Sequence, residues 1–140
     1  MEKVCLVIGA GAGIGGNVAH RFALGGYHAA LCRRSNEDGL NATIKNIQDE
    51  GGSASGYLLN IVEEGAIEEL TAQVEKIGPI EVVVFNLGAQ IGNRSLANTS
   101  LKNFELGWQL ACFGLFRLAK TIVPLMQERG GGTILVTSAT

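Results

Sequence analysis

The residues best suited to chemistry lie in a glycine-rich segment near the start of the chain, VIGAGAGIGG at residues 7–16. It follows a short apolar run and precedes a stretch of helical periodicity, the place where an α/β sheet receives a phosphate group. Glycine there permits positive φ and lets backbone N–H groups approach a pyrophosphate without a Cβ in the way. We therefore predict a dinucleotide on this turn, the alternative being a flexible turn of small residues.

Two glycine patterns overlap in this segment. The first is Gly9-x-x-x-Gly13-x-Gly15 and the second is Gly11-x-Gly13-x-x-Gly16. The first is preferred because it abuts the apolar run directly. The residues predicted to contact the cofactor here are Gly9, Ala12, Gly13, Ile14 and Gly15.

A basic pair, Arg33 and Arg34, stands at the end of the second apolar run, in LCRRS. An NAD-specific site usually places a carboxylate here for the ribose 2'-hydroxyl. A guanidinium instead pairs with a 2'-phosphate through two charge-assisted hydrogen bonds, so the pair favours NADP(H) over NAD(H). The alternative is a solvated basic pair at a strand end.

Short apolar runs and longer amphipathic stretches alternate along the chain and supply the elements that position these groups. The strands are predicted at residues 4–8, 27–32, 54–59, 80–86 and 133–137, and the helices at 13–24, 37–50, 63–77 and 101–129. Continuously apolar strands suit burial on both faces, and strand–helix alternation predicts a parallel sheet. We expect an α/β, doubly wound, Rossmann-like domain of about five strands and four helices.

Composition narrows the function classes. The formal net charge is −2, which argues against nucleic-acid binding, and 46% of the residues are hydrophobic, enough for one core. The three cysteines show no metal-ligand spacing, so no metal site is predicted. No signal-peptide pattern and no unbroken membrane-length apolar stretch is present, so a soluble cytoplasmic protein with no membrane partner is expected.

With these motifs the chain resembles the short-chain dehydrogenase/reductase family, and the match covers nearly all of residues 1–140. Gly9, Gly13 and Gly15 fill the family's TGxxxGxG turn, with Ile8 at the threonine position. Asn60, followed by Ile61, stands where the family has an Asp near the adenine. FNLG at residues 85–88 resembles the NNAG turn, which implies cofactor contacts for Asn86 and Gly88. A turn residue that satisfies local backbone groups is an equal alternative for Asn86.

The resemblance is weaker for the family's catalytic residues. Ala111 stands where the family has the Asn of a water-linked proton relay, and Ala139 takes the position of the catalytic Ser. Ser138, one residue away, is the candidate that remains. The family's Tyr-x-x-x-Lys helix would follow Thr140, so the tyrosine and lysine are absent from this sequence and the domain is expected to be incomplete at its C-terminal end.

The resemblance implies an NADP(H)-dependent oxidoreductase that transfers hydride to or from a small carbonyl or alcohol substrate. This chain alone is expected to be inactive. The alternatives are a noncatalytic dinucleotide-binding protein and an inactive truncated fragment. The resembled family also forms dimers through its fourth and fifth helices, so a homo-oligomer through the helix at 101–129 is a further expectation.

Overall fold

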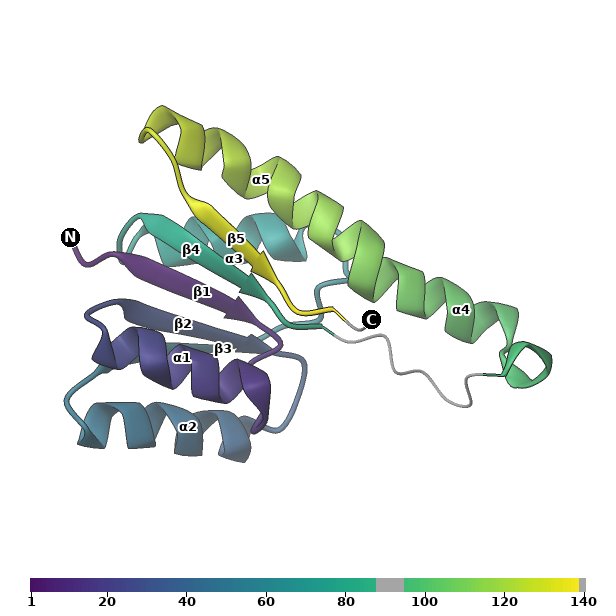
Figure 1. Cartoon of the computed structure of the whole chain (residues 1–140), viewed down its shortest axis with the longest axis horizontal. Helices are drawn as coiled ribbons and strands as arrows, with labels where there is room; N and C mark the ends of the chain where they lie inside the picture. Colours follow the sequence, from purple (N-terminus) through teal and green to yellow (C-terminus); the bar gives the residue numbers. More distant parts are fainter. Residues whose placement is uncertain (88–94, 139–140) are drawn as a thin grey trace.

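A computed structural model describes residues 1–87 and 95–138, so Gly88 and Ala139 lie outside the described residues. Five parallel strands form one sheet in the order β3-β2-β1-β4-β5 (Figure 1). The strands are β1 (Val4–Ile8), β2 (His28–Arg33), β3 (Ser53–Leu58), β4 (Ile80–Phe85) and β5 (Thr133–Val136). The predicted doubly wound fold is confirmed, and each predicted strand lies within one residue of its observed bounds.

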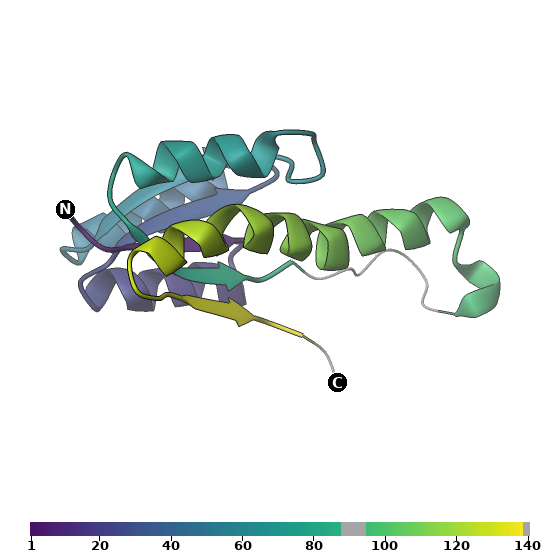
Figure 2. The ribbon, with the colours of Figure 1, turned by 90° about the horizontal axis from the view of Figure 1, so that it is seen from above.

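Helices cover the two faces of the sheet in separate layers (Figure 2). One layer holds α1 (Ile14–Leu24) and α2 (Glu37–Asp49), and the other holds α3 (Ala66–Glu75) and α5 (Gly114–Glu128). Because side chains alternate along a strand, β1 contributes to two cores. Val7 packs in the cluster that contains Ala19 of α1, and Leu6 packs in the cluster that contains Ile67 of α3 and Ile122 of α5. Burial on both faces explains the continuously apolar strand sequences.

The fourth predicted helix is interrupted in the structure. A short η1 (Leu96–Asn98) leads into α4 (Leu101–Trp108), which passes through a π-helical turn, η2 (Gln109–Phe113), into α5. Such turns hold one extra residue per hydrogen-bonded ring, and periodicity in a sequence does not reveal them. Just after η2, a Cβ on Gly114 would lie 2.8 Å from Ile61 Cδ1, so glycine lets the helix lie close to the loop after β3.

Residues 101–128 form the one run in the described chain that is long and apolar enough to cross a membrane by length and composition. Its α5 part packs on the sheet through Leu118, Ile122 and Met126, each at most 5% exposed. Its α4 part extends past the carboxyl ends of the strands (Figure 1). Helix α5 therefore packs one face against the sheet.

The order of the strands creates a switch point between β1 and β4. After β1 the chain winds outward to β2 and β3, and after α3 it returns to β4 on the other side of β1. Connections therefore leave the carboxyl ends of β1 and β4 in opposite directions, and ligands of doubly wound sheets bind in the resulting crevice. The predicted site residues follow the carboxyl ends of the strands that surround this crevice.

Candidate nucleotide-binding site

The turn between β1 and α1 contains three glycines that the fold itself requires. Gly9 has φ 85°, and a Cβ there would lie 2.4 Å from the carbonyl oxygen of Asn86. A Cβ on Gly15 would lie 2.1 Å from the carbonyl oxygen of Gly9, and one on Gly16 would lie 2.5 Å from that of Gly11. Gly9 and Gly15 of the preferred pattern, and Gly16 of the second, are thus explained by close backbone approach.

Gly11 and Gly13 differ, because no described atom lies within 4 Å of the Cβ that either would carry. The backbone N–H groups of residues 12–15 also donate to no acceptor among the described residues. Helix α1 begins at Ile14 with Gly13 as its N-cap, so these donors lie at the positive end of the helix dipole. Open space above Gly13 beside unpaired donors fits a pyrophosphate, and Ala12, Gly13, Ile14 and Gly15 are the residues that would hold it.

A cleft beside the turn brings together five of the predicted residues, Gly9, Arg33, Arg34, Asn60 and Ile61. The rest of its lining is mostly apolar and was not singled out from the sequence. Those residues are Ile8, Cys32, Leu59, Leu87 and Leu110. Burial raises the pKa of the Cys32 thiol to about 12, so this wall of the cleft is uncharged at neutral pH. The lining suits a flat, weakly polar ring flanked by a cationic edge.

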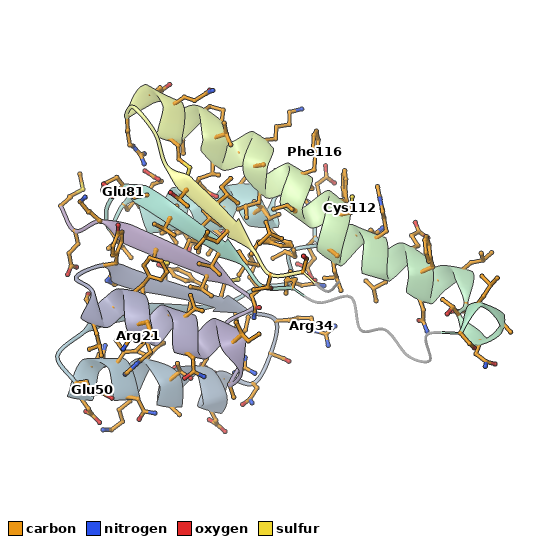
Figure 3. All side chains as sticks on the ribbon, in the orientation of Figure 1. Arg21, Arg34, Glu50, Glu81, Cys112 and Phe116 are labelled. Carbon is orange, nitrogen blue, oxygen red and sulfur yellow. The ribbon has the colours of Figure 1, made fainter. Side chains whose placement is uncertain are left out.

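The cationic edge comes from the carboxyl end of β2. Arg33 is half-buried as the last residue of the strand, and Arg34 is exposed and projects from the strand ends (Figure 3). Neither guanidinium pairs with a carboxylate of the described residues. Asp38, the nearby acidic residue, lies in the first turn of α2. Both arginines are therefore available to an anion.

Asn60 and Ile61 lie in the loop after β3. The Asn60 side-chain oxygen accepts a 3.3 Å hydrogen bond from the Val62 backbone N–H, as a turn residue does, and Ile61 is 4% exposed. Arg117 of α5 donates to the carbonyl oxygens of Ile61 at 3.1 Å and Glu63 at 3.2 Å. A helix from the other end of the chain thus holds this loop against the cleft.

Asn86 lies between the glycine turn and β5. Its side-chain NH₂ donates to the Gly9 carbonyl at 3.1 Å, and its side-chain oxygen accepts from the Thr137 hydroxyl at 2.7 Å. Asn86 thus bonds groups that are distant in the sequence, not the neighbouring backbone of its own turn. Its direct contact with a cofactor stays a prediction, as does that of Gly88 outside the described residues.

The candidate catalytic groups are sparse. Ser138 is exposed beyond the end of β5, and Ala111 lies in the π turn. Tyr57 lies on β3, where its hydroxyl accepts a 3.3 Å hydrogen bond from Ser55, and Tyr27 precedes β2. In residues 1–87 and 95–138 there is no group of three His, Cys, Asp or Glu side chains that could hold a metal ion. Neither tyrosine lines the candidate cleft, although Tyr57 lies opposite the cleft residue Cys32 in the pairing of β2 with β3.

The sequence is similar to a known protein family and to curated members of it. A family model described as short chain dehydrogenase matches residues 3–140. The chain is 30% identical over 138 residues to 7alpha-hydroxysteroid dehydrogenase of Escherichia coli (strain K12), covering 98% of this chain and 53% of that protein. It is 32% identical to the fatty acyl-CoA reductase of Acinetobacter baylyi, covering 98% of this chain and 47% of that protein. The chain thus spans about half the length of these curated relatives.

Solved structures share the fold closely. A 7 alpha-hydroxysteroid dehydrogenase complexed with NADH and 7-oxo glycochenodeoxycholic acid superposes with a TM-score of 0.89 at 30% identity, covering 98% of this chain and 53% of that one. An alcohol dehydrogenase from the archaeon Thermococcus sibiricus, complexed with 5-hydroxy-NADP, gives a TM-score of 0.87 at 29% identity, covering 98% and 58%. Dinucleotides with and without a 2'-phosphate therefore occur among the structural neighbours.

Proposed function

Because this chain belongs to the short-chain dehydrogenase family, we propose that it is the cofactor-binding part of an NADP(H)-dependent oxidoreductase acting on a small carbonyl or alcohol. The observation that carries the proposal is the cleft shared by Gly9, Arg33 and Asn60 beside the open, donor-rich turn at Gly13. The cofactor supplies the hydride chemistry. The residues of this chain bind and orient it.

Three parts of the dinucleotide, the pyrophosphate, the adenine and the 2'-phosphate, would each meet a matching surface on this chain. The N–H groups of residues 12–15 would hold the pyrophosphate at the start of α1. The apolar wall at Cys32 and Ile61 would take the adenine, with Asn60 at its edge. Arg33 would pair with a 2'-phosphate, because its guanidinium is half-buried beside the cleft and has no carboxylate partner among the described residues.

The preference for NADP(H) rests on charge. A carboxylate at the end of β2 would accept a hydrogen bond from the ribose 2'-hydroxyl of NAD and would repel a 2'-phosphate. This chain has Arg33, Arg34 and Ser35 there instead. One of the neighbours named above holds NADH and the other 5-hydroxy-NADP, so the structural likeness favours neither cofactor. The preference proposed here therefore rests on the two arginines.

A titration of the 140-residue chain with NADPH and with NADH, at matched ionic strength, tests the proposal. NADPH should bind more tightly, and Arg33→Ala should weaken NADPH about tenfold or more while changing NADH little, since a charge-assisted contact is lost. Arg21→Ala is the matched control, because Arg21 is an exposed arginine of α1 away from the cleft and its loss changes the net charge equally (Figure 3). Equal NADPH loss in both variants, or no binding by a folded chain, would reject the assignment.

A noncatalytic dinucleotide-binding protein is the second candidate, favoured by Ala111, whose methyl group cannot carry a proton relay. Measuring turnover distinguishes this candidate from an oxidoreductase. A longer chain that includes the second half seen in the relatives should oxidise NADPH with a panel of carbonyl substrates if the first proposal is right. Tight NADPH binding by that longer chain without turnover on any of them would favour the second.

A further inference from the structure

The carbonyl oxygen of Gly9 accepts two hydrogen bonds within the glycine turn. It accepts the Gly11 N–H at 2.9 Å and the Asn86 side-chain NH₂ at 3.1 Å, and Gly15 lies against it without a side chain. A peptide group is planar, so the direction of this carbonyl also sets the direction of the Ala10 N–H, which donates to the carbonyl oxygen of Cys32 at 2.9 Å. A group that fixes the direction of the Gly9 carbonyl therefore also fixes the direction of the following peptide N–H in the turn.

The hydrogen-bond chemistry of Asn86 fixes which of its atoms faces which partner. A carbonyl only accepts, so the NH₂ must face Gly9 and the amide oxygen must face Thr137. The Thr137 hydroxyl has one proton and two acceptors in reach, the Asn86 oxygen at 2.7 Å and the Phe85 carbonyl oxygen at 3.4 Å. The hydroxyl proton lies on the shorter contact, so the Thr137 hydroxyl donates to the Asn86 side-chain oxygen, and the Asn86 NH₂ donates to the Gly9 carbonyl.

Thr137 is well placed to act through Asn86. It follows β5 directly, and its backbone N–H donates to the carbonyl oxygen of Phe85 at 3.1 Å, which ties it to the end of β4. The last strand residues Leu135 and Val136 are 44% and 48% exposed, so packing holds this end of β5 only weakly. The hydroxyl therefore links a sparsely packed strand end to the turn at the carboxyl end of β1.

We propose that Thr137 is a positioning residue for pyrophosphate binding, acting through Asn86 on the Gly9 carbonyl and hence on the N–H groups of the turn. The inference rests on the proposed dinucleotide function. It assigns Thr137 no contact with the cofactor. Its effect should fall on the part of the ligand that lies on the turn, because Arg33 and Asn60, which would meet the 2'-phosphate and the adenine, come from β2 and the loop after β3.

The test compares Thr137→Val, which removes the hydroxyl at nearly constant volume, with Thr137→Ser, which keeps it. The probes are NADPH and adenosine 2'-monophosphate, which has the 2'-phosphate but no 5'-phosphate. Thr137→Val should weaken NADPH about fivefold, the effect of one net hydrogen bond, and leave the monophosphate within about twofold of wild type. Thr137→Ser should bind both as wild type does. Thr133→Val, the same change at the other end of β5, is the matched control.

Three results would overturn the proposal: unchanged NADPH affinity in Thr137→Val, equal loss of both probes, or failure of serine to restore binding. Equal loss would indicate general loosening of the domain. If wild type binds neither probe, the dinucleotide function itself fails. The amide NMR resonances of Ala10 and Gly11 then still test the link without ligand, since they should shift in Thr137→Val and stay in place in Thr133→Val.

Discussion

Single atoms decide much of this site. Five glycines stand between residues 9 and 16, yet the structure separates them into two kinds. A Cβ on Gly9, Gly15 or Gly16 would lie within 2.5 Å of a backbone oxygen, whereas one on Gly11 or Gly13 would meet no described atom within 4 Å. The first kind builds the turn, and the second leaves room above it.

Alanine substitutions should separate these two roles. Gly15→Ala should lower the free energy of unfolding by about 2 kcal/mol or more, because the Gly9 carbonyl must move. Gly13→Ala should cost only about 0.5 kcal/mol, the preference for glycine over alanine at an N-cap, while weakening NADPH strongly. Urea denaturation and NADPH titration of the two variants would measure this. A Gly13→Ala protein that binds NADPH normally would show that the ligand does not approach this glycine.

His28 supplies a second residue-scale prediction. It is 7% exposed on β2, its ring nitrogens lie 2.7 Å from Ser53 Oγ and 2.8 Å from Ser55 Oγ, and Glu2 lies 3.8 Å away. Burial lowers its pKa below the usual 6.5, against a smaller opposing effect of Glu2. The unfolded chain therefore binds the proton more readily than the folded one, and stability that is full above pH 6.5 falls as the pH drops below it.

Thermal melts between pH 7.5 and 5.5 should show this loss in wild type. His28→Gln, which has no titrating ring, should lose less over the same range, whatever its stability at pH 7.5. Identical slopes in wild type and His28→Gln would contradict the assignment of the pH dependence to His28.

At the scale of elements, distant parts of the chain meet to build the site. The loop after β3 carries Asn60 and Ile61, and α5 holds it through Arg117. The same guanidinium lies 3.2 Å from a carboxylate oxygen of Glu68 on α3, and its side chain is only 15% exposed. A planar, forked donor suits this set of three oxygens better than an ammonium does. Arg117 thus joins two helices and the loop of the cleft.

Arg117→Lys should therefore lower the free energy of unfolding by about 1–2 kcal/mol, because lysine cannot reach all three oxygens. NADPH should also bind severalfold more weakly, since the loop beside the adenine is less firmly held. Chemical denaturation and NADPH titration measure the two effects. Lys120→Arg, the reverse exchange at an exposed position of the same helix, should change neither. Unchanged NADPH affinity and an unchanged free energy of unfolding in Arg117→Lys would mean that the hydrogen bonds to the two carbonyls contribute nothing.

At the scale of the whole molecule, four exposed aromatic side chains follow one another along α4, η2 and α5. Phe104, Trp108, Phe113 and Phe116 are 40–70% exposed, and the Trp108 and Phe113 rings stack with centroids 5.2 Å apart. Exposed aromatic patches of this kind are typical of interaction sites. A homo-oligomer through this helix, implied by the family resemblance, stays a prediction that this surface supports.

Phe116→Lys should weaken self-association at least about tenfold, since an exposed aromatic anchor of the patch is replaced by a charge. Leu24→Lys places the same charge on an apolar residue of α1, 45% exposed, and serves as the control. Sedimentation velocity over a range of concentrations measures both. A monomeric wild type, or equal weakening by the two variants, would remove this face as the interface.

Periodicity alone predicted the alternation of strands and helices, because burial on two faces imposes apolar runs such as VVVF and one-sided helices. The glycine spacing likewise predicted a turn between β1 and α1, since such turns follow local backbone rules. The nucleotide on it, and the role of the arginine pair, stay predictions. These features depend on neighbours in the chain. A sequence can therefore display them directly.

Other features needed the folded chain. The π turn at Gln109–Phe113, the hold of Arg117 on Ile61 and Glu63, and the relay from Thr137 through Asn86 to Gly9 left no local pattern. The last two join residues at least 51 positions apart, and three of their four acceptors are backbone carbonyls, which every residue has. The bonds of Asn86 arise only when strand order brings the ends of β1, β4 and β5 side by side, and those of Arg117 when α5 packs near the loop after β3. Tertiary packing therefore decided which glycines build the turn and which residues hold it.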